Sequence, residues 1–474
     1  LLIGIIFCIF FYVNIFIPIS ISVIVSTLLL INFFIKFKKN KIGLLVFILI
    51  VFYTLPFIHI IGYIWFDFES IPPEKLWWWD TSPVVDDMFD QKIITFMAML
   101  GVVGLTGISF GISLNNKYVL IDRDFNLAIK KNKIKTMNIY IWTFWVFFGL
   151  ILSYITSPTE TIFQSSHNTT KGIQASMNFA SSWMMSYIVL IFSYADSLFE
   201  KNPIKRIIKK IIILSIITYI FFWLQIMRGD REFISWIFAI ILMNIYWARP
   251  YFKNQNKISY SLPWLKIMIF IFVLIFIAII ISNTRHSISG LNFSLFIEFI
   301  LEKISNGILS FSSIITGTWS SILRTPLSVA SDYINGELVF NYGKDYLNLF
   351  LSLPPGFVAD FFEYARPLST NSGPANKMIY GLGGTHSTVV PFMNFGIIGV
   401  FTIHALWAYF FSNYEKKISN RFTVINLSFF GAITMAAPWW LWYGEKFIIN
   451  AFLIWIIFSF FYKISIYLSR KSIY

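Results

Sequence analysis

The stretch IITFMAMLGVVGLTGISFGIS, residues 93–113, contains no charged side chain. An α-helix rises about 1.5 Å per residue, so a stretch of this length crosses the roughly 30 Å hydrocarbon layer of a bilayer. Apolar stretches of about 17–25 residues recur along the chain. These stretches predict a protein that crosses a membrane many times as helices.

The composition excludes a soluble domain and a spanning β-barrel. Apolar residues make up 57% of the 474 residues, aromatic residues 20% and charged residues only 13%. The alternating strands of about ten residues that a barrel requires are not seen. The single cysteine, Cys8, lies in an apolar run, which leaves neither a disulfide nor a thiolate metal cluster. We therefore predict an all-α polytopic membrane protein.

The expected spans give about eleven or twelve transmembrane helices. The opening run from Leu1 to Ile35 is too long for one upright helix, and Pro18 leaves open either two short spans or one kinked span. The run lacks a basic n-region and a small-residue cleavage site, so no removable signal peptide is predicted. Further spans are expected at 43–66, 93–113, 138–156, 177–198, 211–226, 233–248, 264–282, 387–411, 422–438 and 447–468.

The connecting segments sort by charge, which predicts the orientation of the protein. The net charge of +14 is not one patch, so it does not indicate nucleic acid. The positive-inside rule places the basic segments in the cytoplasm, and the intervening segments then face outward. The basic segments are 36–41, 114–137, 201–210, 249–257, 416–421 and 470–471. The outer segments are 67–92, 157–176, 228–232, 283–386 and 439–446.

The outer segment 283–386 is too long for a simple connection. Residues 293–304 have amphipathic helical spacing, which suits a helix in the membrane interface. Glycine and proline in the second half predict turns that fold the segment back over the membrane. The chain then divides into an N-terminal helix bundle at 1–282, a large outer loop with amphipathic helices at 283–386, and C-terminal helices at 387–474, all in one integrated membrane domain.

Cations gather at the predicted outer ends of the spans, against the positive-inside tendency. A guanidinium fork matches the paired oxygens of a diphosphate, so a lipid diphosphate is the anion expected there. Neutralisation of Arg228 and Arg231 by Asp230 and Glu232 is the alternative. The predicted anion-binding residues are Arg228, Arg231 and Arg285, with Arg324, Arg366 and Lys377 as further candidates.

Among the histidines, His386 is the main catalytic candidate. It follows a glycine-rich run at the outer start of a span, where a neutral imidazole can take a proton from a sugar hydroxyl. His286 is a second candidate because it follows Arg285. Packing or solvation accounts for the remaining histidines, which are His59, His167 and His404. Asp86 and Asp87 offer a less favoured metal site, and we predict none.

The segment GTHSTVVPFMNFGIIG, residues 384–399, resembles the start of a late helix in bacterial O-antigen polymerases, the Wzy family, and in O-antigen ligases. The turn MRGDR at 227–231 resembles the Gly-Ser-Arg turn of that superfamily, with Asp230 in place of the serine. Arg285 lies where these families place another arginine. The segment NYGKDYL at 341–347, followed by LPP at 353–355, is similar to the outer loop of repeat-unit polymerases. The resemblance covers roughly half the chain.

The resemblance implies a fold related to the GT-C membrane glycosyltransferases in the bacterial inner membrane, with the active site facing the periplasm and no cofactor or metal. Undecaprenyl-diphosphate-linked oligosaccharides would be donor and acceptor, and a chain-length determinant protein is an implied partner. His386 would act as general base, while Arg231 and Arg285, with Arg228 as a third, would hold the diphosphate. A single displacement would invert the anomeric centre.

Three alternatives to the polymerase remain. An O-antigen ligase shares the chemistry but delivers the glycan to lipid A core. A polysaccharide or lipid flippase would place charges along a pathway through many helices, whereas the candidate charges here collect at outer ends. A membrane acyltransferase would use a histidine but give the arginines no purpose.

Overall fold

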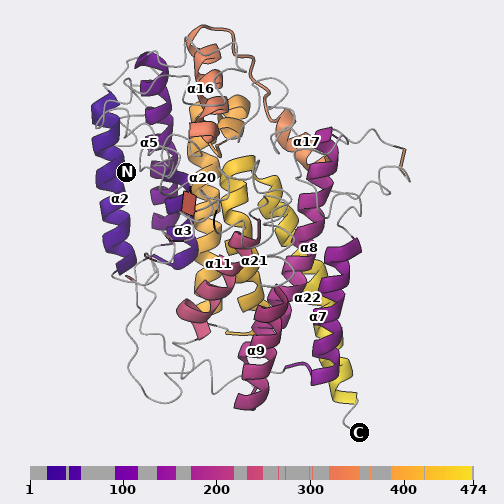
Figure 1. Ribbon diagram of the computed structural model, residues 1–474. Helices are drawn as coiled ribbons and strands as arrows, with labels where there is room; N and C mark the ends of the chain where they lie inside the picture. Colours follow the sequence, from indigo (N-terminus) through magenta and orange to yellow (C-terminus); the bar gives the residue numbers. More distant parts are fainter. Residues whose placement is uncertain are drawn as a thin grey trace. The chain divides into compact units, whose positions relative to one another are not determined.

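The computed structural model describes the chain as a set of helices, and no strand occurs in the described part (Figure 1). The description covers residues 19–38, 42–54, 91–115, 136–155, 172–217, 232–248, 320–352, 362–363, 386–420 and 422–471, with the single positions 265, 269, 273, 298, 301 and 302. The chain forms two compact units, of which the first comprises Leu1–Ile121, Phe311–Lys416 and Ala437–Ile448 and the second Asp122–Ser310, Lys417–Ala436 and Ile449–Tyr474. Each unit combines segments that are far apart in the sequence, whereas the predicted division at 282 and 386 follows the order of the chain.

The first unit is built around helix α5. Helices α2 and α16 pack on α5, and α2 also contacts the short helix α3. In the apolar stretch Lys92–Ser113 of α5, 89% is buried inside the protein, whereas only 28% is buried in the stretch Ser20–Phe37 of α2. The bounds are α2 Ile19–Lys38, α3 Leu44–Thr54, α5 Gln91–Ser113, α16 Ser320–Ile334, α17 Lys344–Ser352 and α20 Val389–Asn420.

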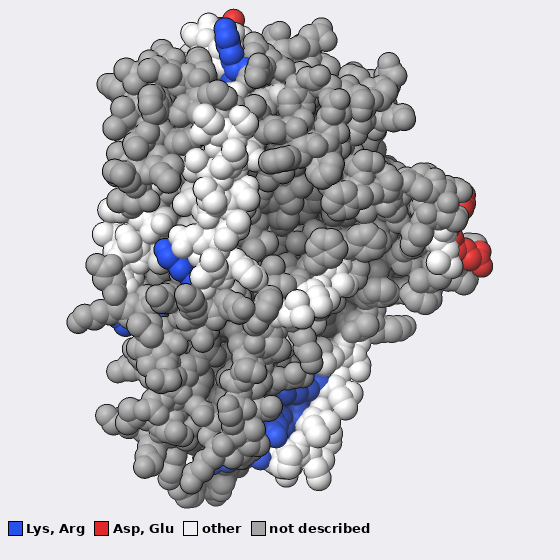
Figure 2. Space-filling view, turned by 90° about the vertical axis from the view of Figure 1, so that its left-hand side faces the viewer, with Lys and Arg blue, Asp and Glu red and all other residues white. Residues whose placement is uncertain are grey.

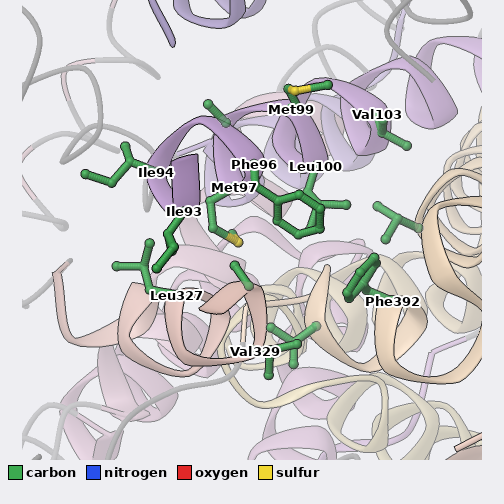
Figure 3. Close-up of a cluster of buried hydrophobic side chains, with 14 of the residues drawn as sticks. Ile93, Ile94, Phe96, Met97, Met99, Leu100, Val103, Leu327, Val329 and Phe392 are labelled. Carbon is green, nitrogen blue, oxygen red and sulfur yellow. The ribbon is translucent and has the colours of Figure 1, made fainter. Parts of the chain in front are cut away.

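Three helices of the first unit share one apolar core (Figure 3). Side chains of α5, such as Phe96 and Leu100, point toward Leu327 and Val329 of α16 and toward Phe392 of α20. The ring of Phe96 meets that of Phe392 edge to face, with centroids 5.4 Å apart. This core joins the start of α20, which lies three residues after His386, to α5, the helix predicted as the span 93–113.

Glycines allow α5 and α20 to approach backbone to backbone. A methyl group added at Gly107 would lie 2.3 Å from the carbonyl oxygen of Phe401, and one at Gly111 would lie 2.1 Å from that of Ala405. The spacing of four residues puts both glycines on one side of α5. Small residues at this spacing let membrane helices pack closely, since side-chain bulk would separate them.

The second unit contains helices α7, α8, α9 and α11 together with parts of α21 and α22. Helix α8 packs on α7 and α9, and α11 continues as a short π-helix, η7. Gly431 of α21 lies against Met243 and Ile191, where an added methyl group would lie 2.6 Å from the Met243 sulfur. The bounds are α7 Ile139–Ile155, α8 Gly172–Leu198, α9 Pro203–Ile217, α11 Glu232–Leu242, η7 Met243–Ala248, α21 Val424–Tyr443 and α22 Lys446–Lys471.

Helices α9 and α20 extend by eight or more residues beyond the predicted spans into predicted basic segments, so those predicted boundaries were wrong. Helix α9 begins at Pro203, eight residues before the span expected at 211–226. Asn202 caps it, because the Asn202 Oδ1 accepts hydrogen bonds from the backbone N–H groups of Ile204 and Lys205 at 3.0 and 3.2 Å. Helix α20 likewise continues past 411 to Asn420. Lysine and arginine are good helix formers, although they end an apolar stretch. A helix end placed where the hydropathy falls therefore makes the helix too short.

Four described helices are long and apolar enough to cross a membrane: Ser20–Phe37, Lys92–Ser113, Val389–Ile418 and Lys446–Ser469. Shorter apolar helices occur at Leu44–Thr54, Ile139–Leu152, Met184–Leu198, Ile234–Ile245 and Val424–Trp440. On α2 the exposed side chains are largely apolar, and Figure 2, seen from the side of α2, shows white surface there. Such a face is stable in lipid rather than in water. The residues are Ile21, Ile24, Leu28, Ile31 and Ile35.

Candidate functional site

His386 lies three residues before α20, in the first unit, and its side chain is fully buried. Its Nε2 is 2.9 Å from the backbone oxygen of Tyr53, near the end of α3. Its Nδ1 is 2.9 Å from the Oγ1 of Thr388 and 3.3 Å from the backbone nitrogen of the same residue. The imidazole therefore has a fixed orientation between α3 and the start of α20.

These partners define the tautomer of His386. A carbonyl oxygen only accepts, so Nε2 carries the proton and donates to Tyr53. A backbone N–H only donates, so Nδ1 carries the lone pair and accepts from Thr388. Burial lowers the pKa of His386 to about 3, and the Tyr53 hydrogen bond only partly opposes this effect. The ring is thus a neutral acceptor whose basic nitrogen is Nδ1.

His404 lies in the same cluster, although packing alone was expected for it. Its Nδ1 donates to the backbone oxygen of Val400 at 2.7 Å, and its Nε2 accepts from the Ser387 hydroxyl at 3.0 Å. The Tyr53 ring meets the rings of His386 and His404 edge to face, with centroids 4.9 Å apart in each pair. Replacing His404 by alanine would therefore disturb the surroundings of His386.

The resemblance segment 384–399 contains a break in α20 at Gly396. Its φ of 63° and ψ of −150° lie outside the helical region, in a conformation that glycine adopts far more readily than other residues. Just before the break, Asn394 reaches the second resemblance segment, 341–347. Its Oδ1 accepts from the backbone N–H groups of Gly343 and Asp345 at 3.0 and 3.3 Å. Asn394 thus satisfies donors at the start of α17.

Asp345 lies in the first turn of α17 and is 2% exposed. Its Oδ2 accepts from the side-chain amides of Asn341 and Asn394, both at 2.8 Å. The backbone N–H of Asn341 donates to the carbonyl of Met393 at 2.8 Å. A carboxylate at a helix N-terminus is also favoured by the helix dipole. The two resemblance segments therefore form one hydrogen-bonded unit.

Glu445, between α21 and α22, joins this cluster and was not predicted as a site residue. Its side chain is 2% exposed, its Oε1 accepts from the Tyr346 hydroxyl at 3.2 Å, and its Oε2 has no hydrogen-bond partner among the described residues. Burial raises its pKa to about 7. The Tyr346 ring stacks on Phe395 at 5.7 Å between centroids. The signal that could have identified Glu445 is an acidic residue directly beside an apolar span, which the sorting of loops by charge did not consider.

The other predicted site residues are not brought together within the described part of the chain. Arg324 lies in α16, and its side chain is outside the described part. Outside the described residues lie Arg228, Arg231, Arg285, His286, Arg366 and Lys377, together with Asp86, Asp87, His59 and His167. Their predicted roles remain predictions.

The fold defines a class, that of helical membrane proteins. No family model, curated protein sequence or solved structure matches the chain. The polar cluster around His386, Asp345 and Glu445 therefore has to be interpreted from its own chemistry and from the resemblance of its motifs.

Proposed function

We propose that this protein is a polysaccharide repeat-unit polymerase of the O-antigen type. It transfers a growing glycan from undecaprenyl diphosphate to a hydroxyl of a new lipid-linked repeat unit at the outer face of the bacterial inner membrane. The observation that carries the proposal is the contact between segments 341–347 and 384–399. Both segments were singled out for their resemblance to polymerases, and the Asn394 side chain of the later segment accepts from the backbone N–H of Gly343 and donates to the Asp345 carboxylate of the earlier one.

His386 supplies the base in this proposal. Its Nδ1 lone pair accepts the proton of the acceptor hydroxyl as the sugar oxygen attacks the anomeric carbon of the donor. The bond from that carbon to the diphosphate oxygen breaks, and the electron pair leaves with the diphosphate. Arg231 and Arg285, with Arg228, are proposed to stabilise the charge on the leaving group. Burial keeps the Nδ1 lone pair of His386 unprotonated near neutral pH, and the same burial makes the imidazole a weaker base than a solvated histidine.

The test uses purified protein in proteoliposomes with undecaprenyl-diphosphate-linked repeat units and measures glycan ladders. The wild-type protein should build ladders without ATP or nucleotide sugar, and in excess EDTA. His386→Gln keeps a donor for Tyr53 but lacks the base, so chain extension should fall by about 10²–10⁴-fold. Arg231→Ala and Arg285→Ala should lose activity, and they should also bind the lipid diphosphate more weakly.

The control for His386 has to keep the histidine cluster packed. His404→Gln retains an amide near Ser387 and should preserve ladder formation, whereas His404→Ala would open a space beside Tyr53. A monodisperse His386→Gln protein that builds full ladders would remove the base assignment. Transfer to lipid A core in place of chain extension would identify a ligase.

A further inference from the structure

Helix α17 presents an apolar side to the exterior and a more polar side to the interior. Leu347 and Phe350 are each 60% exposed, and Leu351 is exposed as well. Residues at positions i, i+3 and i+4 lie on one face of a helix, so these three side chains form a continuous apolar face. A surface helix in water has the opposite arrangement. The buried side chains of α17 are Asp345, Leu349 and Ser352.

The turn that precedes α17 fixes which side of the helix faces outward. Tyr342 has a φ of 46°, in the left-handed region, which is costly for tyrosine and persists only where the surroundings hold it. The Asn341 N–H donates to the Met393 carbonyl at 2.8 Å. The Gly343 N–H donates to the Asn394 Oδ1 at 3.0 Å. The helix therefore cannot roll to bury its apolar face without breaking these hydrogen bonds.

The apolar face of α17 lies beside exposed apolar surface of α20, a helix long and apolar enough to cross a membrane. The Tyr346 ring, next to Leu347 in the chain, stacks on the ring of Phe395 with centroids 5.7 Å apart. Phe395 is itself exposed, and Ile398 is 71% exposed. Both residues lie in the predicted span 387–411, so we expect them to contact lipid. The same lipid would cover the neighbouring face of α17.

The N-terminal end of α17 carries side chains that are typical of a membrane interface. Tyr342 is 83% exposed, and Lys344, the first residue of the helix, is exposed as well. Tyrosine is enriched at the level of the lipid headgroups, because its ring is apolar and its hydroxyl is polar. Lysine can lay its carbon chain along apolar surface while its ammonium reaches the phosphates. This end of the helix therefore suits headgroups, whereas the face with Leu347 and Phe350 suits acyl chains.

We propose that α17 lies in the interface of the bilayer and anchors the segment 341–352 there. Leu347, Phe350 and Leu351 insert among the lipid acyl chains, and Lys344 lies among the lipid phosphates. The sequence predicted an interfacial helix at 293–304, which is a different segment. This role of α17 does not depend on the polymerase function.

A second copy of the chain fits this face less well than the bilayer does. A stable protein interface takes about 20–30 residues on each side. Helix α17 has nine residues and is therefore only about 14 Å long. A lipid surface has no such minimum, since apolar side chains insert into it one by one.

The anchor has a consequence for the polar cluster. On the buried side of α17, the Asp345 carboxylate accepts from the Asn394 amide at 2.8 Å, and the Tyr346 hydroxyl donates to Glu445 at 3.2 Å. A helix held in the interface by its outer face therefore holds this cluster at headgroup depth.

The experiment measures the depth of spin labels by electron paramagnetic resonance of the full chain in lipid nanodiscs. Because Cys8 is the one cysteine of the sequence, Cys8→Ser gives a background in which each new cysteine is labelled alone. Labels at Phe350→Cys and, in a separate protein, Leu347→Cys should collide often with oxygen, which concentrates in the hydrocarbon layer. They should collide several-fold less with a water-soluble nickel chelate.

Two further positions calibrate the measurement. Ile398→Cys is the lipid-exposed reference on α20, and Glu337→Cys is the aqueous reference, because Glu337 is an exposed charged residue in the turn after α16. All four proteins are compared only when monodisperse. The two α17 labels should resemble the label at position 398 and differ from the one at 337.

Two outcomes would overturn the proposal. Nickel accessibility at positions 347 and 350 as high as at 337 would show that the face of α17 is in water. Low accessibility to both oxygen and nickel would show that protein covers the face, either another segment of this chain or a second copy. Since neither readout involves catalysis, a failure of the proposed polymerase activity leaves the result unchanged.

Discussion

Each of the two compact units buries a cluster of charged side chains, and the two clusters differ in how charge is balanced. In the second unit the Lys209 ammonium lies 2.9 Å from Glu200 Oε2 and 3.6 Å from Asp196 Oδ2. The Oδ1 of Asp196 accepts from the Tyr462 hydroxyl at 2.7 Å and from the backbone N–H of Met137 at 3.0 Å. These contacts join α7, α8, α9 and α22.

In the first unit, Asp345 and Glu445 are buried with no described cation paired to either. Amides satisfy Asp345, whereas the Oε1 of Glu445 accepts from the Tyr346 hydroxyl and its Oε2 has no hydrogen-bond partner among the described residues. The nearby Asp345 charge raises the pKa of Glu445 further, after burial as the main cause.

The difference separates a cluster that a cation balances from one that no described cation balances. The buried ion pair of the second unit resists change, because removal of either partner leaves an uncompensated charge. Burial without a cation raises the pKa of Glu445 to about 7, and perturbed pKa values of this kind cluster at functional sites. Mutations should therefore act on stability in the second unit and on pH dependence in the first.

The largest effect is expected for Lys209→Met. Removing the cation leaves Asp196 and Glu200 without compensation, so the free energy of unfolding should fall by about 3–5 kcal/mol in an SDS titration of the purified protein. Lys205→Met in the same helix is the control, because Lys205 is exposed and its loss should change stability by less than about 0.5 kcal/mol. Equal losses in the two variants would contradict a structural role for the network.

Next is the pH dependence caused by Glu445. Its pKa in the folded protein is about 7, above its ordinary value of 4.5, so the folded state binds this proton more tightly than the unfolded state. The contribution of protonated Glu445 to the free energy of unfolding is fully present below about pH 4.5 and is lost as the pH rises through about 7, a change on the order of 3 kcal/mol. Glu445→Gln should remove this slope.

Glu200 of the second unit gives a contrast of opposite sign. Partial burial alone would raise its pKa, but the hydrogen bond and charge of Lys209 outweigh burial and lower it. Its contribution is present above its ordinary value of 4.5 and is lost as the pH falls through its lowered value. Because glutamine mimics the protonated carboxyl, both variants should differ from wild type at pH 7 and above, where Glu445→Gln should be more stable than wild type and Glu200→Gln less stable. Identical pH profiles would remove the proposed distinction.

A smaller loss is expected for Asn394→Ala. It takes one of two amide donors from Asp345 and the acceptor from two backbone N–H groups, so stability should fall by about 2 kcal/mol. Asn335→Ala at the exposed end of α16 loses one 3.4 Å contact with Ser331 and should be nearly neutral. An Asn394→Ala protein as stable as wild type would show that α17 is held by other contacts.

The smallest effect is expected for Tyr346→Phe, which keeps the stacking on Phe395 and removes one hydroxyl. Stability should fall by about 1 kcal/mol, as for a single hydrogen bond. Because that bond lowers the pKa of Glu445, the upper end of its pH transition should move to higher pH. A transition that does not move would show that the 3.2 Å hydrogen bond from Tyr346 has no effect on the pKa of Glu445.

Much of the helical fold within the described residues could be predicted from hydropathy. Helices α5, α7, α8 and α22 lie within a few residues of the helices expected at 93–113, 138–156, 177–198 and 447–468, apart from an earlier start to α8, and of these α5 and α22 are long and apolar enough to cross a membrane. Boundaries failed at α9 and α20, because side-chain caps and helix propensity, rather than hydropathy, decide where a helix ends. The number of spans and their orientation remain predictions.

The candidate site was predictable only in part. His386 was identified because a histidine after a glycine-rich run at a span boundary is unusual, and segments 341–347 and 384–399 because of their resemblance. The sequence did not indicate that Asn394 would bond to Asp345, since 49 residues separate them. Glu445 was counted among the charges of an outer loop, although the structure buries it.

The sequence by itself determined that this chain enters a membrane as helices, because transfer of apolar stretches into lipid depends on local composition and length. The tertiary structure alone decided which polar groups meet. Hydrogen bonding between α3 and the start of α20 sets the tautomer of His386, and burial beside α17 raises the pKa of Glu445. Both depend on distances between residues far apart in the chain. Hydropathy carries no information about such distances, since it is a property of neighbours in sequence and not in space.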